Sequence, residues 1–200
     1  VYIKLNLSER AININTKDAN LIAEFNAIKI SNIDINLNLI KFLKNESSIK
    51  NIKIESSSNL IKDVTSFLNT IDYNLSRYIF YSQIKEGLLN FELDAKLDSK
   101  RQESLSYFIS GSVNKAKFNI PGYESLNDLN FKFQTQDRIT KISNLNFIYQ
   151  KIIFSSKRLD VKGEKSGEYY VEGDIENTKA LINSNLIFKF INIKHDYLSN

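Results

Sequence analysis

Strict alternation of apolar and polar residues is the feature that most constrains the fold of this 200-residue chain. In the segment 89–98, Leu89, Phe91, Leu93, Ala95 and Leu97 are apolar, and every residue between them is polar. Because successive side chains of a strand point to opposite faces, such a segment forms a ribbon with one apolar and one polar face. Similar ribbons recur along most of the chain, so a long apolar surface must be covered by the protein itself, by a partner or by lipid.

Composition places the chain among globular proteins, with 42% hydrophobic and 25% charged residues. The net charge is only +4, and the basic residues are scattered among acidic ones. A nucleic-acid-binding surface concentrates basic residues more strongly, so we expect no nucleic-acid partner. The chain contains no Met, and we therefore expect it to be an internal segment of a longer protein. No run approaches the ~18–20 apolar residues of a membrane-spanning helix.

Residues that carry chemistry are sparse. There is no cysteine, which excludes disulfides and thiolate ligands, and His195 is the single histidine. The carboxylates Glu92, Asp94 and Asp98 alternate with apolar residues, as expected on the wet face of a strand. No motif selects a catalytic group, a metal site or a cofactor, so we expect a protein that is not an enzyme and holds neither metal nor cofactor.

The alternation predicts a mainly β protein with minor α content and a change of period in the middle. Residues 1–58 read as strands, 59–81 as a helical insert, and 82–200 as an antiparallel meander. The apolar phase slips by one around Ser31–Asn32, which predicts a bulge or tight turn. Further turns are expected at Ser8–Arg10 and Pro121-Gly122, and the crowded apolar residues 39–43 suggest a short helical turn.

The insert contains one clear amphipathic helix, expected from about Asn59 to Thr70. Its apolar positions have helical spacing, and Ser57, Ser58 and Asn59 are good N-cap residues. A second, weaker helical stretch is expected over 74–81. The first helix is expected to plug or cap one end of the sheet rather than lie on a membrane, because Lys62 and Asp63 do not make a basic polar face. Its apolar residues are Leu60, Val64, Phe67, Leu68 and Ile71.

Two architectures remain open from the alternation itself. The apolar faces can form the filled core of a closed β-sandwich, or they can line an open groove. Taken alone, the pattern favours the sandwich.

Several segments carry degenerate strand motifs that shift this balance. In Ile28–Ile54, an apolar alternation is followed by NLIKFL at Asn38–Leu43 and by the basic strand IKNIKI at Ile49–Ile54. The second half contains similar motifs at Gly87–Leu97, Ser110–Ala116 (SGSVNKA), Asn144–Phe147 (NLNF) and Tyr169–Asn177 (YYVEGDIEN). In these segments the chain resembles the AsmA-like family of bacterial envelope proteins, which includes YhdP and TamB.

The resemblance implies a curved, taco-like antiparallel sheet with an apolar groove. It further implies a periplasmic protein, attached to the inner membrane through a segment not present here, that carries phospholipid acyl chains between inner and outer membranes and supports outer-membrane lipid homeostasis. The expected groove residues are Leu89, Phe91, Leu93, Leu97, Tyr107, Ile109, Leu129, Phe131, Phe133, Leu145, Phe147, Tyr149 and Val171.

Two other functions compete with lipid binding. A structural or adhesive β-module would bind a protein partner through an exposed edge strand. A carbohydrate hydrolase on a β-scaffold would need two carboxylates facing each other in a polar cleft.

Overall fold

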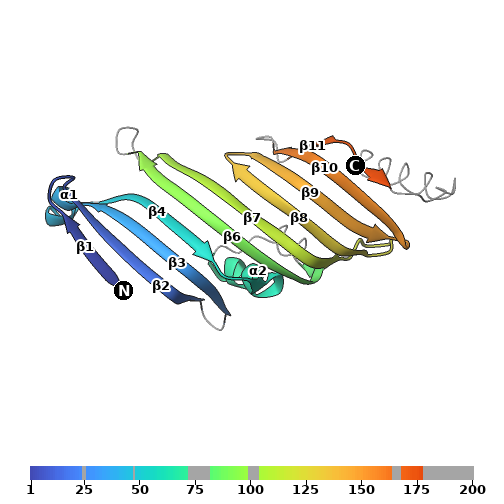
Figure 1. Cartoon of the computed structure of the whole chain (residues 1–200), viewed down its shortest axis with the longest axis horizontal. Helices are drawn as coiled ribbons and strands as arrows, with labels where there is room; N and C mark the ends of the chain where they lie inside the picture. Colours follow the sequence, from blue (N-terminus) through green and yellow to red (C-terminus); the bar gives the residue numbers. More distant parts are fainter. Residues whose placement is uncertain (24–25, 47, 72–81, 99–103, 164–167, 178–200) are drawn as a thin grey trace.

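A computed structural model describes residues 1–23, 26–46, 48–71, 82–98, 104–163 and 168–177 (Figure 1). Within these residues, twelve strands form one sheet, and two helices accompany it. The helices are α1 (Leu39–Leu43) and α2 (Ile61–Ile71). The strands are β1 (Tyr2–Asn6), β2 (Ala11–Ala23), β3 (Asn26–Asn38), β4 (Ile49–Ser56), β5 (Asn59–Leu60), β6 (Ile84–Asp98), β7 (Ser104–Phe118), β8 (Leu126–Gln136), β9 (Ile139–Tyr149), β10 (Ile152–Gly163), β11 (Tyr169–Gly173) and β12 (Glu176–Asn177).

The strands follow one another in a meander, and every described pair is antiparallel. The order is β1-β2-β3-β4-β6-β7-β8-β9-β10-β11, with β5 beside β6 and β12 beside β10. Helix α2 lies in the chain between β4 and β6, yet these two strands pair directly. The strand regions before and after the helical insert therefore belong to one continuous sheet.

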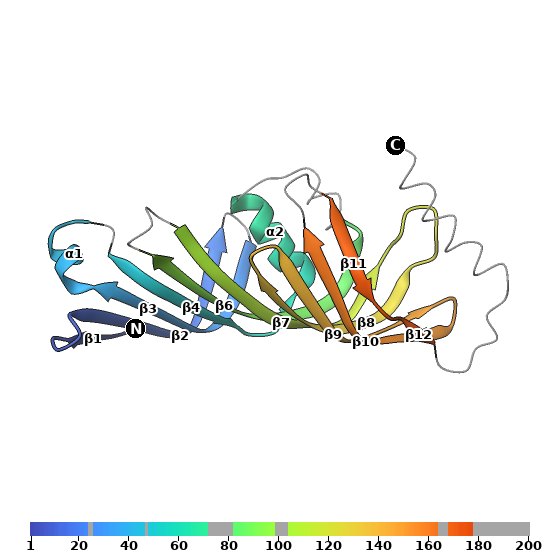
Figure 2. The same cartoon turned by 90° about the horizontal axis from the view of Figure 1, so that it is seen from above.

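The described residues form an open, curved sheet, so the closed β-sandwich is not the architecture of this part of the chain. Figure 2 shows the sheet curling upward along its length, with α2 on the inner side of the curve. We call the side that carries α2 the concave face and the other side the convex face. The mainly β, curved antiparallel fold expected from the sequence is confirmed.

β-Bulges interrupt the sheet between β3 and β4 and, in a line, from β6 to β9. The register between β3 and β4 shifts between Ile30 and Asn32, which confirms the bulge predicted at Ser31–Asn32. Further shifts interrupt the pairing of β6 with β7, β7 with β8 and β8 with β9. Near them, Lys115, Asp128 and Asn144 have positive φ values of 52°, 48° and 53°. A bulge bends its strand and increases its twist, so these bulges account for the curl.

Side-chain amides on the convex face support this line of bulges, since bulged backbone groups lose their ladder partners. Asn130 Oδ1 accepts a hydrogen bond from the backbone N–H of Lys115 at 2.8 Å. Asn130 Nδ2 also donates to Asn146 Oδ1 at 3.1 Å. One strand pair away, Asn90 Oδ1 accepts from the backbone N–H and the hydroxyl of Ser112 at 3.1 and 2.7 Å. The amides thus hold β6 to β9 together where the ladder is irregular.

Helix α2 confirms the predicted amphipathic helix, but its first residue and the set of side chains it buries differ from the prediction. It begins at Ile61 rather than Asn59, and Leu60 belongs to β5 and is 43% exposed. The side chains that bury against the sheet are Ile61, Val64 and Phe67. The helix packs on β3, β6 and β2. The prediction that it caps one end of the sheet is wrong, because it lies on the concave face over strands inside the strand order.

Asn59 does not cap α2 as predicted; it extends the pairing of β3. Its Oδ1 accepts a hydrogen bond from the backbone N–H of Lys29 at 2.8 Å, and its Nδ2 donates to the carbonyl of the same residue at 3.0 Å. A second bond from Nδ2 reaches the carbonyl of Ser57 at 2.8 Å. The side chain is only 6% exposed. It therefore replaces the strand partner that β3 loses where β4 ends at Ser56, and it fixes the start of α2 against the sheet.

The short helix and the two turns predicted from the sequence are confirmed, and two other predicted segments lie outside the described residues. Helix α1 occupies the crowded apolar segment 39–43, capped by the side chain of Asn38. The turns at 8–10 and 121–122 are present; in the second, the N–H of Tyr123 donates to the carbonyl of Ile120 at 2.9 Å. The helix expected over 74–81 and the C-terminal part of the expected meander beyond residue 177 lie outside the described residues.

The packing of α2 predicts a sharp contrast between two neighbouring helix positions. Phe67 is 8% exposed and contacts Ile28 and Ile30, whereas Leu68 is 42% exposed. We expect Phe67→Ala to lower the free energy of unfolding by about 3–5 kcal/mol, because it opens a cavity in a packed cluster. Leu68→Ala is the matched control and should cost less than about 1 kcal/mol. Urea denaturation followed by circular dichroism measures both, and equal losses would contradict the described orientation of α2.

Candidate functional site

Apolar side chains form continuous rows along the concave face. Residues directly paired on adjacent strands lie on the same face of a sheet, so the strand register defines these rows. They run across the strands, along the length of the trough. One row consists of Ile3, Ile14, Ile35, Ile52, Ala95 and Tyr107, from β1 to β7. The next consists of Thr16, Ile33, Ile54, Leu93, Ile109, Thr135, Thr140, Val161 and Val171, from β2 to β11.

The polar atoms in the middle of the second row are satisfied locally. The hydroxyls of Thr135 and Thr140 lie 3.0 Å apart and bond to each other. This shared bond satisfies one of the two O–H donors, which lowers the cost of passing an apolar chain over the pair. The row therefore presents an apolar path even where it contains threonine.

A hollow of about 480 Å³ lies on this face between α2 and strands β6 to β9. Helix α2 contributes Ile61, Val64, Thr65 and Leu68 to its lining. Its volume falls in the range of roughly 300–1,000 Å³ that is typical of small-molecule sites. Among the described residues, none of the side chains that line it is ionisable. The sheet contributes Ile84, Leu89, Val113, Ala116, Phe118, Leu129, Phe131, Phe133, Thr140 and Ile142.

The structure brings a first group of the expected groove residues together around this hollow. Leu89, Leu129, Phe131 and Phe133 all line it. The rings of Phe131 and Phe133 lie 6.3 Å apart and are tilted by 57°. Phe91 packs against the Phe67 cluster at the side of the hollow.

A second group lies elsewhere along the same sheet. Leu93 and Ile109 pair with each other in the second apolar row. Tyr107 is 36% exposed and Val171 on β11 is 65% exposed, so both are open to solvent. Leu97 is placed near the end of β6, opposite Leu105.

A third group is packed away rather than open. Leu145, Phe147 and Tyr149 form a cluster with Phe154 and Leu159, and the rings of Phe147 and Phe154 stack 5.3 Å apart. All five side chains are less than 9% exposed. They form the solid C-terminal part of the concave face, beside the hollow rather than within it.

Several lining residues were missed by the sequence reasoning. Val113 lies opposite both Leu89 and Phe131, and Ile142 lies opposite Phe133. Val113 belongs to a clear alternating run in the sequence, so its position on the apolar face of the strand could have been predicted. Ile142 follows only from the register between β8 and β9, which the alternation does not provide.

Burial changes the acid–base behaviour of one residue in the packed cluster. Desolvation raises the pKa of the Tyr149 phenol above its ordinary value of 10.0, and the charges of Glu124 and then Tyr123 raise this pKa further. The folded state therefore favours the neutral phenol. Among the described residues, no group of acidic or histidine side chains is arranged to hold a metal ion. No helix in that part of the chain is long and apolar enough to cross a membrane.

The raised pKa of Tyr149 predicts alkaline destabilisation. The unfolded chain releases the phenolic proton at a lower pH than the folded protein does, so stability is fully present below pH 10 and declines as pH rises through the folded-state pKa. Tyr149→Phe should make this decline shallower. The measurement is the urea midpoint between pH 8 and 11, with Tyr169→Phe, which is 74% exposed in the native protein, as the control. An unchanged slope in Tyr149→Phe would contradict the assigned burial.

Comparisons of this chain with protein-family models, with curated proteins and with solved structures found no match. The functional proposal therefore rests on the geometry of the concave face. This face is an open apolar trough with a hollow beside α2, and the described side chains that line the hollow carry no charge.

Proposed function

We propose that this chain is a segment of an AsmA-like bacterial envelope protein that shields or conducts phospholipid acyl chains along its concave face. In this proposal the protein resides in the periplasm and is attached to the inner membrane through a segment outside this one. It passes lipid between the inner and outer membranes and so contributes to outer-membrane lipid homeostasis.

The observation that carries the proposal is the continuity of the apolar rows across the sheet. Ten strands lie side by side on the main path from β1 to β11. With neighbouring strands about 4.8 Å apart, nine spacings give a path of roughly 40 Å. This exceeds the ~30 Å thickness of a whole bilayer core, so several lipids can lie along it in succession.

The chemistry of the hollow fits acyl chains better than polar ligands. Each buried CH₂ contributes about 0.8 kcal/mol, without the directional partners that a polar ligand needs. Among the described residues, the polar side chains in the lining are Thr65 and Thr140, whose hydroxyls already bond to Lys62 O and Thr135. Because the trough is open along one side, a headgroup can stay in water while its chain is buried.

A protein partner at a sheet edge is the second candidate, supported by the edge strand β1. Among the described strands β1 pairs with β2 alone, and its Ile3 and Leu5 are 64% and 53% exposed. An exposed apolar edge accepts an added strand from another chain. In that case the apolar rows would continue into the partner.

Lipid binding predicts a face-specific effect of charge. Leu68 lines the hollow and is 42% exposed, so Leu68→Glu places a carboxylate in the acyl-chain path without removing core packing. We expect the protein purified from a bacterial host to carry phospholipid, and the variant to lose most of it, because burying a carboxylate beside methylene groups is strongly unfavourable. Native mass spectrometry and lipid extraction measure the bound lipid.

The matched control is Ile153→Glu, which adds the same charge at a residue that is 53% exposed. Ile153 precedes the concave-face residue Phe154 in β10, so it lies on the convex face, away from the hollow. It should retain bound lipid. Folded protein that is free of lipid even after incubation with phospholipid vesicles, or equal loss in both variants, would argue against the proposal. Strand addition by a partner would then be the better explanation, and Leu5→Pro should abolish it.

A further inference from the structure

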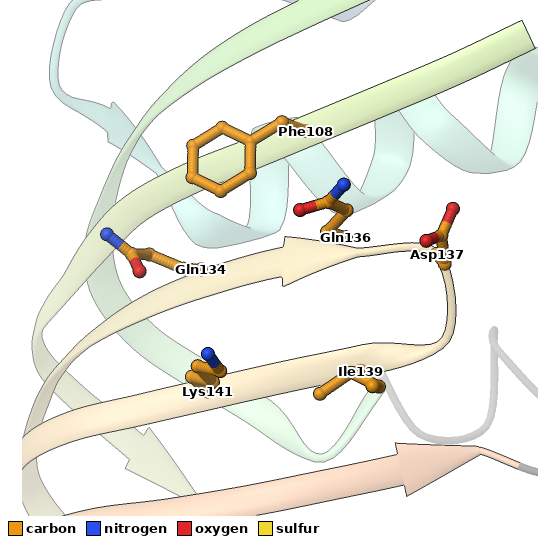
Figure 3. A pocket seen from close by; sticks show the side chains of 6 residues that line it. All are labelled: Phe108, Gln134, Gln136, Asp137, Ile139 and Lys141. Atoms are coloured by element: carbon orange, nitrogen blue, oxygen red, sulfur yellow. The ribbon is translucent and has the colours of Figure 1, made fainter.

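A second hollow lies on the convex face, opposite the trough. It measures about 330 Å³ and is lined by Phe108, Gln134, Gln136, Asp137, Ile139 and Lys141 (Figure 3). Phe108, Gln134 and Lys141 each neighbour a concave-face residue in the chain, so they point to the other side of the sheet. This surface is polar and amide-rich, in contrast to the apolar trough.

Strand register brings these residues together. Phe108 on β7 lies directly opposite Gln136 on β8, and Gln136 lies opposite Ile139 on β9. Gln134 and Lys141 form the adjacent pair. The hydroxyl of Tyr107 donates to the carbonyl of Asp137 at 3.1 Å, which holds the β8–β9 turn against β7. The site is therefore built on three paired strands and one tethered turn.

The polar groups around Phe108 have unused hydrogen-bonding capacity. Within the described part of the chain, the side chains of Gln134, Gln136, Asp137 and Lys141 make no hydrogen bond or ion pair to another residue. The two amides each offer one acceptor oxygen and two N–H donors. Lys141 lies opposite Asp160, which is engaged by Arg158 with N–O distances of 2.9 and 2.6 Å, and the charge of Lys141 contributes to lowering the Asp160 pKa. Lys141 also lines the hollow, beside Gln134 and Ile139 (Figure 3).

A smaller hollow of about 130 Å³ adjoins the first, because Phe108 and Gln136 line both. Asp94 belongs to its lining. Its Oδ2 atom lies 3.9 Å from Lys53 Nζ, and its Oδ1 atom is buried with no hydrogen-bond partner among the described residues. The shared residues join the two hollows into one depression with a carboxylate at one end.

We propose that this convex-face pocket binds a short saccharide. Phe108 is 37% exposed and turns the face of its ring outward, as Figure 3 shows. The face of an aromatic ring is electron-rich, so it attracts the polarised C–H groups on the flat side of a sugar ring. The surrounding amides, carboxylates and ammonium then match the alternating donors and acceptors of sugar hydroxyls. No acid–base step is implied; the site recognises its ligand and does not cleave it.

Saturation-transfer NMR on the folded chain tests this site with cellobiose, maltose and N,N′-diacetylchitobiose as probes. We expect transfer to the ring protons of at least one disaccharide. Phe108→Ala should weaken its binding on the order of tenfold, because the stacking contribution of the ring is lost. Gln134→Ala combined with Gln136→Ala should weaken it similarly, which keeps the test valid if Phe108→Ala fails to fold.

The matched control is Lys132→Ala, which alters an exposed residue of β8 outside the pocket lining and should leave binding unchanged. Leu68→Glu on the concave face should also have no effect, so a failure of lipid binding and a failure of saccharide binding are separable. The proposal is overturned if no disaccharide shows transfer, if Phe108→Ala binds as well as the unaltered protein, or if trialanine occupies the pocket and the sugars do not.

Discussion

The line of bulges across the sheet is the constraint on which the rest of the structure depends. A regular antiparallel sheet of this width twists but does not fold up into a trough. Here register shifts fall at neighbouring positions in the three pairs from β6 to β9, so these strands bend along a common line. A separate shift lies between β3 and β4, and the pairing of β4 with β6 between them is regular. The side-chain oxygens of Asn90 and Asn130 accept hydrogen bonds from backbone N–H groups beside the bulges. The curl that creates a concave face thus follows from irregular pairing stabilised by convex-face amides.

Helix α2 determines which parts of that concave face are filled. Its residues Val64 and Phe67 cover Ile28 and Ile30, while Ile61 reaches Val113 and Ala116 on the other side. The helix thereby bridges β3 and β7 without covering β8 and β9, and the uncovered space beside it is the hollow. At the C-terminal end, Phe147, Phe154 and Leu159 fill the face themselves. One face therefore contains both a packed core and an open trough, a combination that a two-layer sandwich does not have.

The sequence allowed the mainly β class, the hairpins, the first helix and the bulge at Ser31–Asn32 to be predicted, because each leaves a local mark. Alternation shows the strands, a change of period shows α2, and a phase slip shows the bulge. The alternation could not distinguish an open sheet from a closed sandwich. Phe131 and Phe147 belong to the same kind of alternating pattern, yet Phe131 lines the hollow and Phe147 is packed in the C-terminal cluster.

Features of the structure that the sequence pattern did not predict depend on contacts between residues far apart in the chain. Asn59 reads as an N-cap, but its amide pairs with Lys29, thirty residues earlier in the chain. The convex pocket likewise depends on the register that sets Phe108 opposite Gln136.

The central claim is that the concave face, and not the convex one, is the surface that meets acyl chains. Methyl NMR with a phospholipid spin-labelled on its acyl chain tests it most directly. The account predicts strong broadening of methyl signals from Val113, Leu89 and Ile142, which line the hollow, and little effect on the exposed Ile22 and Ile153. Broadening confined to Ile22 and Ile153, or none at saturating lipid, would contradict it.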